Sequence, residues 1–418
     1  MSRLLSSLIL ACFVTTSIAT LAASTEKILY NFTFPTNVAD RFPVGPLTMD
    51  SAGNLYGGAG SGDSFGNDSE IYQLALQSDG TWNENVLYVF PQPEVNPSTA
   101  MVMDSAGNIY GASFSGGNNT VLCAMGYSGC GFIFEMVKTG NTWAAPTPIY
   151  SFGTGRNGAF PNSLTLGPDG NLYGTADYGG KASGNCDQGE CGSVYKLVKQ
   201  SDGSWKFQLI HLFSGGADGG NPNGGGALAF DAAGNLYGSS PLGGLGDGLV
   251  GEFVNQTTFW QEKTISNHFS FTVGDNLQQG MVFDKSGNLY GTTGGGGTTH
   301  NGTVFELTPT TSGQWTKTVL YNFQGGTDGA EPVGQIVLDS AGNLYGSTYQ
   351  GGTSGNGTVW KLSPGSGGWT ETVLHSFAGT PGDGANPTGL LIDSAGTLYG
   401  VTPNGGGGGY GTVFEVTP

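Results

Sequence analysis

The chain has 418 residues, 77 of them glycine, and only 11% of its residues are charged. Its formal net charge of −18 argues against nucleic acid and anionic membrane surfaces as partners. Glycine this frequent, without the three-residue period of collagen and with regularly spaced aromatic residues, predicts a fold with many tight turns.

The N-terminus has the features of a secretory signal peptide. A basic residue, Arg3, precedes the apolar stretch 4–21, which is followed by the small residues Ala22 and Ala23. We therefore expect residues 1–23 to be removed on export. A lipoprotein anchor at Cys12 is the alternative, although the residues before this cysteine match a lipobox poorly. No later segment is apolar enough to span a bilayer, so no membrane span is expected.

Four cysteines remain in the mature chain 24–418, and they form two close pairs in sequence. Cys123 lies near Cys130, and Cys186 lies near Cys191. An exported chain with closely paired cysteines predicts two local disulfides. A single zinc site built from all four thiols is the alternative, but the pairs lack C-x-x-C spacing.

A repeated phrase runs through the whole mature chain. Its form in one copy is Asp339-Ser340-Ala341-Gly342-Asn343-Leu344-Tyr345-Gly346, and its tyrosine recurs at Tyr56, Tyr110, Tyr173, Tyr237, Tyr290, Tyr345 and Tyr399. Four short runs typical of β-strands surround each copy, separated by turn residues. Seven such units predict an all-β fold, a seven-bladed β-propeller with four antiparallel strands per blade.

The two ends of the mature chain predict how the ring closes. The last unit stops after a third strand, 411–418, while the mature N-terminus begins with 26–32, which matches the fourth-strand phrase 318–323. We therefore expect the N-terminal strand to complete the last blade, which also hides the open sheet edges. Period-two alternation places Leu and Tyr of the repeated phrase on opposite sides of each blade, and both sides are predicted to be buried.

The units resemble the GloVer tandem repeat, described from Gloeobacter and Verrucomicrobia sequences. The resemblance is carried by 302–307, 321–332 and 338–346, and it extends over essentially the whole mature chain. It implies an exported bacterial propeller, often surface-associated, with no established catalytic residues to assign. Because this chain ends at Pro418 without a sorting segment, release or periplasmic residence is expected.

One face of the predicted ring carries the candidate binding residues. It receives the Asp-Gly loops between blades, with Asp218, Asp328, Glu331 and Asp383, and the two cysteine-closed loops between second and third strands. Aromatic residues lie nearby, namely Phe114, Tyr127, Tyr178 and Tyr349. Such groups can stack on a sugar or hold Ca²⁺ through oxygen atoms, and no other cofactor is expected. The alternative is that Asp-Gly and Asn-Pro only form turns.

These features favour a non-catalytic extracellular or periplasmic binding or scaffolding propeller, acting as a monomer, whose ligand is a polysaccharide or a protein surface. A propeller enzyme, a lyase or a glycoside-active protein, is the alternative. The G-x-S-x-G match at 62–66 and the G-x-G-x-x-G match at 153–158 do not lie at strand-to-helix turns. Because no histidine and glutamate are expected to pair on one rim, no catalytic residue is predicted.

Overall fold

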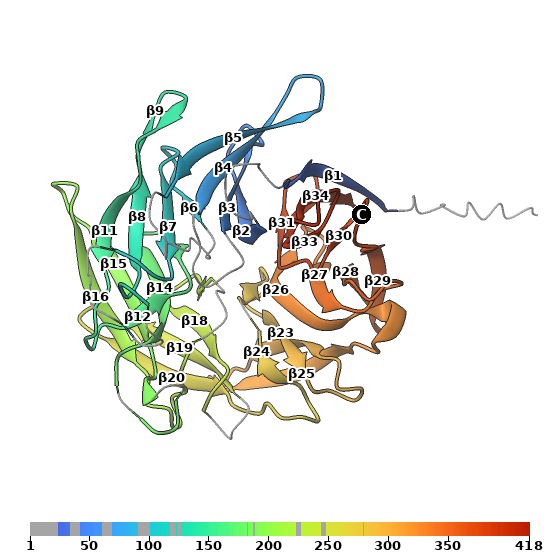
Figure 1. The fold of residues 1–418 in the computed structure, drawn as a ribbon. Helices are drawn as coiled ribbons and strands as arrows, with labels where there is room; N and C mark the ends of the chain where they lie inside the picture. Colours follow the sequence, from blue (N-terminus) through green and yellow to red (C-terminus); the bar gives the residue numbers. More distant parts are fainter. Residues whose placement is uncertain are drawn as a thin grey trace, which may run out of the picture.

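The strands of the protein form a ring of small antiparallel sheets (Figure 1). The computed structural model describes residues 24–33, 42–60, 69–90, 101–117, 123, 127–181, 183–186, 189–222, 227–243, 248–278 and 280–418. The signal peptide predicted at 1–23 lies outside these residues. Within the described residues no helix is long and apolar enough to cross a membrane.

The first four blades follow one another in chain order, and within each blade the chain runs from the innermost strand outward. Blade 1 consists of β2 (Phe42–Met49), β3 (Leu55–Gly60), β4 (Glu70–Leu76) and β5 (Trp82–Val89). Blade 2 consists of β6 (Val102–Met103), β7 (Ile109–Ser113), β8 (Phe132–Met136) and β11 (Thr147–Ser151), with the small hairpin β9 (Lys138–Thr139) and β10 (Thr142–Trp143). Blade 3 consists of β12 (Ala159–Pro161), β13 (Thr165–Leu166), β14 (Leu172–Tyr178), β15 (Ser193–Lys199) and β16 (Trp205–Leu212). Blade 4 consists of β17 (Ala229–Phe230), β18 (Leu236–Ser240), β19 (Leu249–Asn255) and β20 (Trp260–Ser266).

The last three blades repeat the same order. Blade 5 consists of β21 (Asp275–Leu277), β22 (Val282–Phe283), β23 (Leu289–Gly295), β24 (Thr303–Pro309) and β25 (Trp315–Asn322). Blade 6 consists of β26 (Ala330–Leu338), β27 (Leu344–Gln350), β28 (Thr358–Gly365) and β29 (Gly368–Ser376). Blade 7 consists of β31 (Leu390–Ile392), β32 (Leu398–Thr402), β34 (Thr412–Thr417) and β1 (Thr25–Asn31), with the short pair β30 (Gly384–Ala385) and β33 (Asn404–Gly405) beside it. The predicted seven-bladed β-propeller is confirmed.

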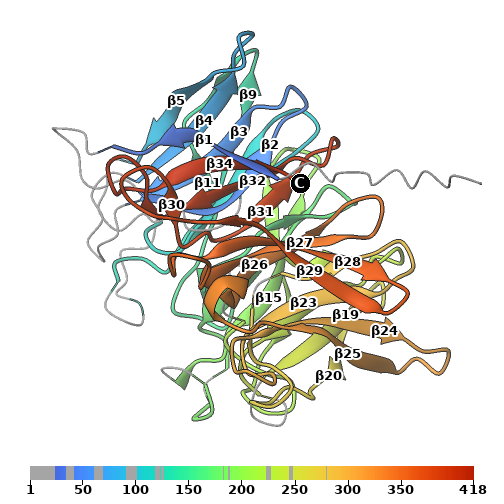
Figure 2. The ribbon, with the colours of Figure 1, turned by 90° about the vertical axis from the view of Figure 1, so that its right-hand side faces the viewer.

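The N-terminal strand closes the ring, as predicted. β1 pairs antiparallel with β34, from Thr25 opposite Thr417 to Asn31 opposite Thr412. Figure 2 shows β1 lying along the outer side of β34. The outer edge of β34 is therefore covered by the start of the chain, which gives blade 7 four strands like the other blades.

The repeated phrase forms the turn between the first and second strands of each blade. In blade 1, the Asp50 carboxylate accepts hydrogen bonds from the backbone N–H groups of Ala52 and Asn54, both at 2.9 Å, and from the Asn54 side chain. The hydroxyl of Tyr56 also donates to Asp50, at 2.8 Å. The same tyrosine-to-aspartate bond recurs in all seven turns, at 2.8–3.3 Å. The buried tyrosines therefore keep a partner for their hydroxyl, as buried polar groups must.

Two sets of aromatic contacts join each blade to the next one. The repeated tyrosine of six blades lies edge-on to a tryptophan of the next blade, at centroid distances of 5.6–6.3 Å. This tryptophan lies at the start of the outer strand in five cases and in β10 in blade 2. The phenylalanine after each outer strand packs on the third-strand aromatic ring of the next blade, at 5.0–6.3 Å. Such pairs add roughly 0.5–1.5 kcal/mol each beyond the area that they bury.

The glycine of the repeated phrase makes room for the third-strand aromatic ring. A Cβ atom on Gly346 would lie 2.2 Å from Cζ2 of Trp360. The Trp360 ring is fully buried and cannot move aside without disturbing its contact with Phe323 of blade 5. Glycine is therefore required at this point for close packing of the two strands.

Candidate functional site

The three predicted aspartates lie at the seams between neighbouring blades, where they bond to the preceding outer strand. Asp218 Oδ2 lies 3.2 Å from Nε2 of His211, and its Oδ1 accepts a hydrogen bond from Ser214. Asp328 accepts hydrogen bonds from the Tyr321 hydroxyl at 2.8 Å and from a backbone N–H. These hydrogen bonds are those expected if the Asp-Gly loops form turns, and contact with a ligand stays a prediction.

Asp383 lies in the equivalent position at the seam between blades 6 and 7, where an imidazole and two backbone N–H groups surround its carboxylate. Its Oδ2 lies 3.1 Å from Nε2 of His375 and accepts a bond from Ala378 N at 2.7 Å, while Oδ1 accepts one from Gly384 N at 2.7 Å. Although burial opposes its charge, these bonds hold the pKa of Asp383 below its usual range.

Glu26 completes a group that we call the closure cluster, formed by Glu26, His375 and Asp383. One ligand atom from each residue lies within 4.8 Å of the others. Burial raises the pKa of Glu26, although the nearby His375 opposes this shift. The histidine and glutamate that were not expected to pair on one rim thus do meet. That expectation was wrong because Glu26 reaches His375 only through ring closure.

Two other seams place a glutamate in the same position on the next blade's outer strand. Glu371 faces Asp328, and burial together with that neighbouring carboxylate raises the pKa of Glu371 to about 8. Burial also raises the pKa of Glu262, which lies near Asp218. At neutral pH Glu371 is therefore protonated, and the seam carries one negative charge, on Asp328, instead of two.

We expect Glu371→Gln to be more stable than the parent protein, by an amount that grows as the pH rises. The folded pKa of Glu371 lies above its ordinary value of 4.5, so this carboxyl contributes stability below pH 4.5 that is lost as the pH rises to about 8. The neutral amide does not titrate, so the two proteins should melt alike near pH 4 and differ by a few degrees above pH 8. Melting curves across this range test the expectation.

Glu84 provides the matched control for this substitution. It occupies the same strand position in blade 1, but its Oε2 accepts a hydrogen bond from the Tyr30 hydroxyl at 2.6 Å. Glu84→Gln should therefore give no stabilisation at any pH. A Glu371→Gln protein whose melting temperature follows the parent at every pH would contradict the proposed repulsion.

Three of the predicted aromatic residues meet on one face, around the buried ring of Phe160. Phe114 stacks on Phe160 at 4.7 Å, while Tyr127 and Tyr178 contact the same ring edge-on at 5.8 and 5.7 Å. Phe160 is fully buried, whereas the other three rings are partly exposed. We call these four residues the aromatic group. It lies where the loops after the second strands of blades 2 and 3 meet.

A disulfide and a strained residue hold the aromatic group in place. Cys123 and Cys130 form the predicted bond, with a Cα–Cα distance of 5.5 Å, and belong to the same hydrophobic cluster as Phe160. Phe160 has φ of 58°, in the left-handed region, and its N–H donates to the Cys130 carbonyl at 2.8 Å. Such a conformation costs about 1–3 kcal/mol, so the surrounding contacts must fix it.

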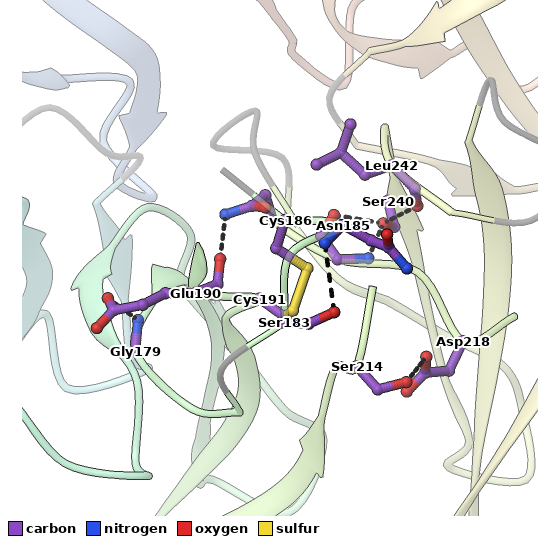
Figure 3. The surroundings of a disulfide bond; sticks show 12 residues. Gly179, Ser183, Asn185, Cys186, Glu190, Cys191, Ser214, Asp218, Ser240 and Leu242 are labelled. Carbon is purple, nitrogen blue, oxygen red and sulfur yellow. Dashed lines mark hydrogen bonds between the residues drawn. A yellow bond between two sulfur atoms is a disulfide. The ribbon is translucent and has the colours of Figure 1, made fainter. Parts of the chain in front are cut away.

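The second predicted disulfide supports the loop that carries Asp218 (Figure 3). Cys186 and Cys191 have a Cα–Cα distance of 5.1 Å. A Cβ atom on Gly215 would lie 2.5 Å from the Cys186 sulfur, so the loop packs directly on this bond. Both disulfides confirm the pairing predicted from spacing, and the alternative of a zinc site built from the four thiols is wrong.

The remaining two predicted residues lie apart from these groups. Glu331 has φ of 56°, is exposed, and donates its N–H to the Asn301 carbonyl at 3.0 Å. Tyr349 is 36% exposed, and its carbonyl accepts a hydrogen bond from Asn386 at 2.9 Å. Neither residue joins the aromatic group in the described residues.

On the opposite face, open clefts lie between the short turns of neighbouring blades, and two of them are lined by described residues alone. One, of about 360 Å³, lies between the turns at Asp50 and Asp104 and includes Lys138. The other, of about 490 Å³, lies between the turns at Asp284 and Asp339. Their carboxylates are already bonded within the turns. A lysine and the serines of the turns line each cleft as well.

Comparison with known families identifies the repeat. The family model for the Gloeobacter/Verrucomicrobia repeat matches residues 43–259 and 246–418. The chain belongs to this repeat family. No curated protein matches it in sequence.

Solved structures resemble this repeat protein in fold alone. The extracellular domain of a putative hybrid two-component system from B. thetaiotaomicron has a TM-score of 0.54 at 11% identity, covering 95% of this chain and 41% of that chain. A protein of unknown function from Dyadobacter fermentans has a TM-score of 0.47 at 12% identity, covering 95% and 100% of the two chains. A gluconolactonase from Xanthomonas campestris has a TM-score of 0.43 at 18% identity, covering 79% and 87%.

The residues of this repeat protein that sequence analysis missed are Phe160 and Glu26. Phe160 occupies the position before a proline that holds Asn221, Glu331 and Asn386 in three other units, and blade 1 also has a phenylalanine there, Phe42. Glu26 lies six residues before Phe32, as Glu371 lies six residues before Phe377. Aligning the N-terminal strand with the other outer strands would therefore have revealed the position of Glu26.

Proposed function

We propose that this protein is an exported, non-catalytic binding propeller whose ligand is a polysaccharide. The observation that carries the proposal is the aromatic group, with three partly exposed rings on the face of the disulfide-closed loops. Flat rings with apolar faces and a polar edge suit stacking against a sugar ring while the hydroxyls bond at its rim.

Rigidity of the aromatic group supports this role. A binding surface gains affinity when its side chains do not have to be ordered on contact with the ligand. The stacked Phe114 and Phe160 rings and the Cys123–Cys130 bond fix the group before any ligand arrives. The two disulfides are also of the kind that persists in oxidising compartments, in agreement with the predicted signal peptide.

An enzyme is the alternative, and the closure cluster is the observation that favours it. An imidazole beside two carboxylates can move protons. The cluster, however, joins two outer strands, β1 and β29, and the loop between blades 6 and 7. It lies on different blades from the aromatic group, so the two cannot act on one sugar ring together.

The test is a glycan-array and polysaccharide pull-down screen on the mature protein, with calcium present and absent. Replacing Tyr127 and Tyr178 by alanine should weaken binding of the retained polysaccharide by about 10-fold or more, which corresponds to about 1.4 kcal/mol. Lys285→Ala, on the short-turn face, is the control and should bind normally. If the tyrosine variants bind like the parent while Lys285→Ala does not, the ligand binds on the short-turn face and the proposed placement at the aromatic group is wrong. Retention of a protein and no glycan would make a protein surface the ligand.

A further inference from the structure

We propose that Glu26, His375 and Asp383 bind a divalent transition-metal ion of the zinc class at the seam where the ring closes. One imidazole nitrogen and two carboxylate oxygens converge there, all within 4.8 Å of one another. Neutral imidazole and carboxylates are among the ligands that zinc prefers, and three protein ligands leave a fourth position for water.

The ligand distances suit a small ion after a modest adjustment. Zinc bonds of about 2.0–2.2 Å in a tetrahedral site place the ligand atoms about 3.4 Å apart. His375 Nε2 and Asp383 Oδ2 are already 3.1 Å apart. Glu26 is the ligand that must move inward. It lies on β1, an edge strand that pairs with one neighbour, β34, rather than with two. Calcium fits less well because it takes 6–8 oxygen ligands.

The surroundings of the cluster already orient two of the three ligands. The N–H groups of Ala378 and Gly384 donate to the two oxygens of Asp383 and fix the carboxylate. The His375 ring packs edge-on to Phe377 at 4.6 Å, which fixes the imidazole plane. Contacts of this kind around a metal site hold the ligands in position and raise affinity.

The environment of Glu26 also suits a positive ion, although the Oε1 atoms of Glu84 and Glu371, at the equivalent strand position, are shielded in the same way. Glu26 Oε1 is shielded from solvent and has no hydrogen-bond partner among the described residues. A shielded carboxylate oxygen without a partner is costly, and a bound cation would remove the cost. Glu415 adds a further negative charge near Glu26, and Lys27 lies 3.8 Å from Glu415.

Comparison with the other seams explains why the site occurs at this position. The seam with Asp328 has Tyr321 in place of the histidine, and the tyrosine hydroxyl satisfies the carboxylate. The seam with Asp218 has His211, but its glutamate, Glu262, accepts a hydrogen bond from Thr264 instead. Within the described residues, only the closure cluster brings a histidine and two carboxylates together.

A metal bound here would link the N-terminal strand directly to blade 6. Besides the pairing of β1 with β34 in blade 7, one hydrogen bond already joins the start of the chain to blade 6, from the Ser24 hydroxyl to the Leu374 carbonyl at 2.6 Å. The ion would therefore add a cross-link between chain segments from opposite ends of the sequence. Its binding free energy would then add to the stability of the closed ring.

The test is a calorimetric titration of zinc into the protein, purified without a histidine tag. The parent should bind one zinc ion per chain, and its melting temperature should rise with zinc concentration. His375→Tyr reproduces the arrangement found at Tyr321. It should melt like the parent without metal but lose zinc binding, and Glu26→Gln should bind at least 10-fold more weakly. His211→Tyr is the matched control and should retain one ion per chain.

Two outcomes would overturn the proposal. A parent protein that binds no zinc at tens of micromolar lacks the site. A His375→Tyr protein that binds zinc with the stoichiometry and affinity of the parent, or a His211→Tyr protein that loses the ion, places the metal elsewhere. Because the metal-free melting curves show whether each variant is folded, a loss of binding cannot be mistaken for a loss of structure.

Discussion

Deletion of residues 24–32 should lower the melting temperature by about 10 °C or more, or abolish a single cooperative transition. The deletion removes β1 and exposes the whole edge of β34. It also removes Phe32, which is 2% exposed and packs on Tyr72 of blade 1 at 5.4 Å. Loss of a buried phenylalanine alone costs about 3–5 kcal/mol, and 1 kcal/mol shifts the melting temperature by about 2–4 °C even in a larger domain.

A rearranged chain shows whether the effect of the deletion comes from losing strand β1 or from shortening the N-terminus. Thr25 lies opposite Thr417, so the deleted residues can be added after Pro418 through a short Gly-Ser turn. This addition turns the closing pair into an ordinary hairpin, as in the other six blades, and should restore the parental melting curve. A deletion protein that melts like the parent would refute the role of β1 in closing the ring.

The strands could be predicted because each repeat carries its own turn and its own alternation. The phrase around Tyr345 contains every partner of its turn, from Asp339 to the tyrosine hydroxyl. Such local contacts can be inferred from one unit, and seven similar units then imply the ring. The contacts across seams were not predicted, because the tyrosine and its tryptophan partner are in different units.

The candidate site shows the same division between local and distant contacts. Tyr127 lies in a loop closed by its own disulfide and Phe114 shortly precedes that loop, so their meeting could be predicted from nearby sequence. The closure cluster combines Glu26 with His375, which are adjacent only after the whole ring has formed. Asp383 was predicted to contact a ligand, although an Asp-Gly loop also uses its carboxylate to satisfy its own backbone.

The repeated turns should make the protein unfold in acid over a narrow pH range. Although burial opposes the charge, hydrogen bonds from side chains and backbone N–H groups lower the pKa values of Asp50, Asp104, Asp284 and Asp339. The pKa of Asp169 falls to about 2, helped by Lys196 at 2.9 Å. A folded pKa below the ordinary value of 3.8 means that the stabilisation is present above pH 3.8 and lost as the pH falls towards 2. Since every turn holds a buried tyrosine in place, protonation at several turns acts on several seams at once.

Melting curves between pH 2 and pH 7 test this linkage. The melting temperature should change little from pH 7 to pH 5 and then fall steeply below about pH 4. Asp169→Ala removes the carboxylate from one turn, so it should melt several degrees below the parent at pH 7 and approach the parent near pH 2. Glu331→Gln, which changes an exposed carboxylate outside the turns, is the control and should follow the parent throughout. An Asp169→Ala protein that stays equally far below the parent at every pH would show that the carboxylate acts through packing rather than through its charge.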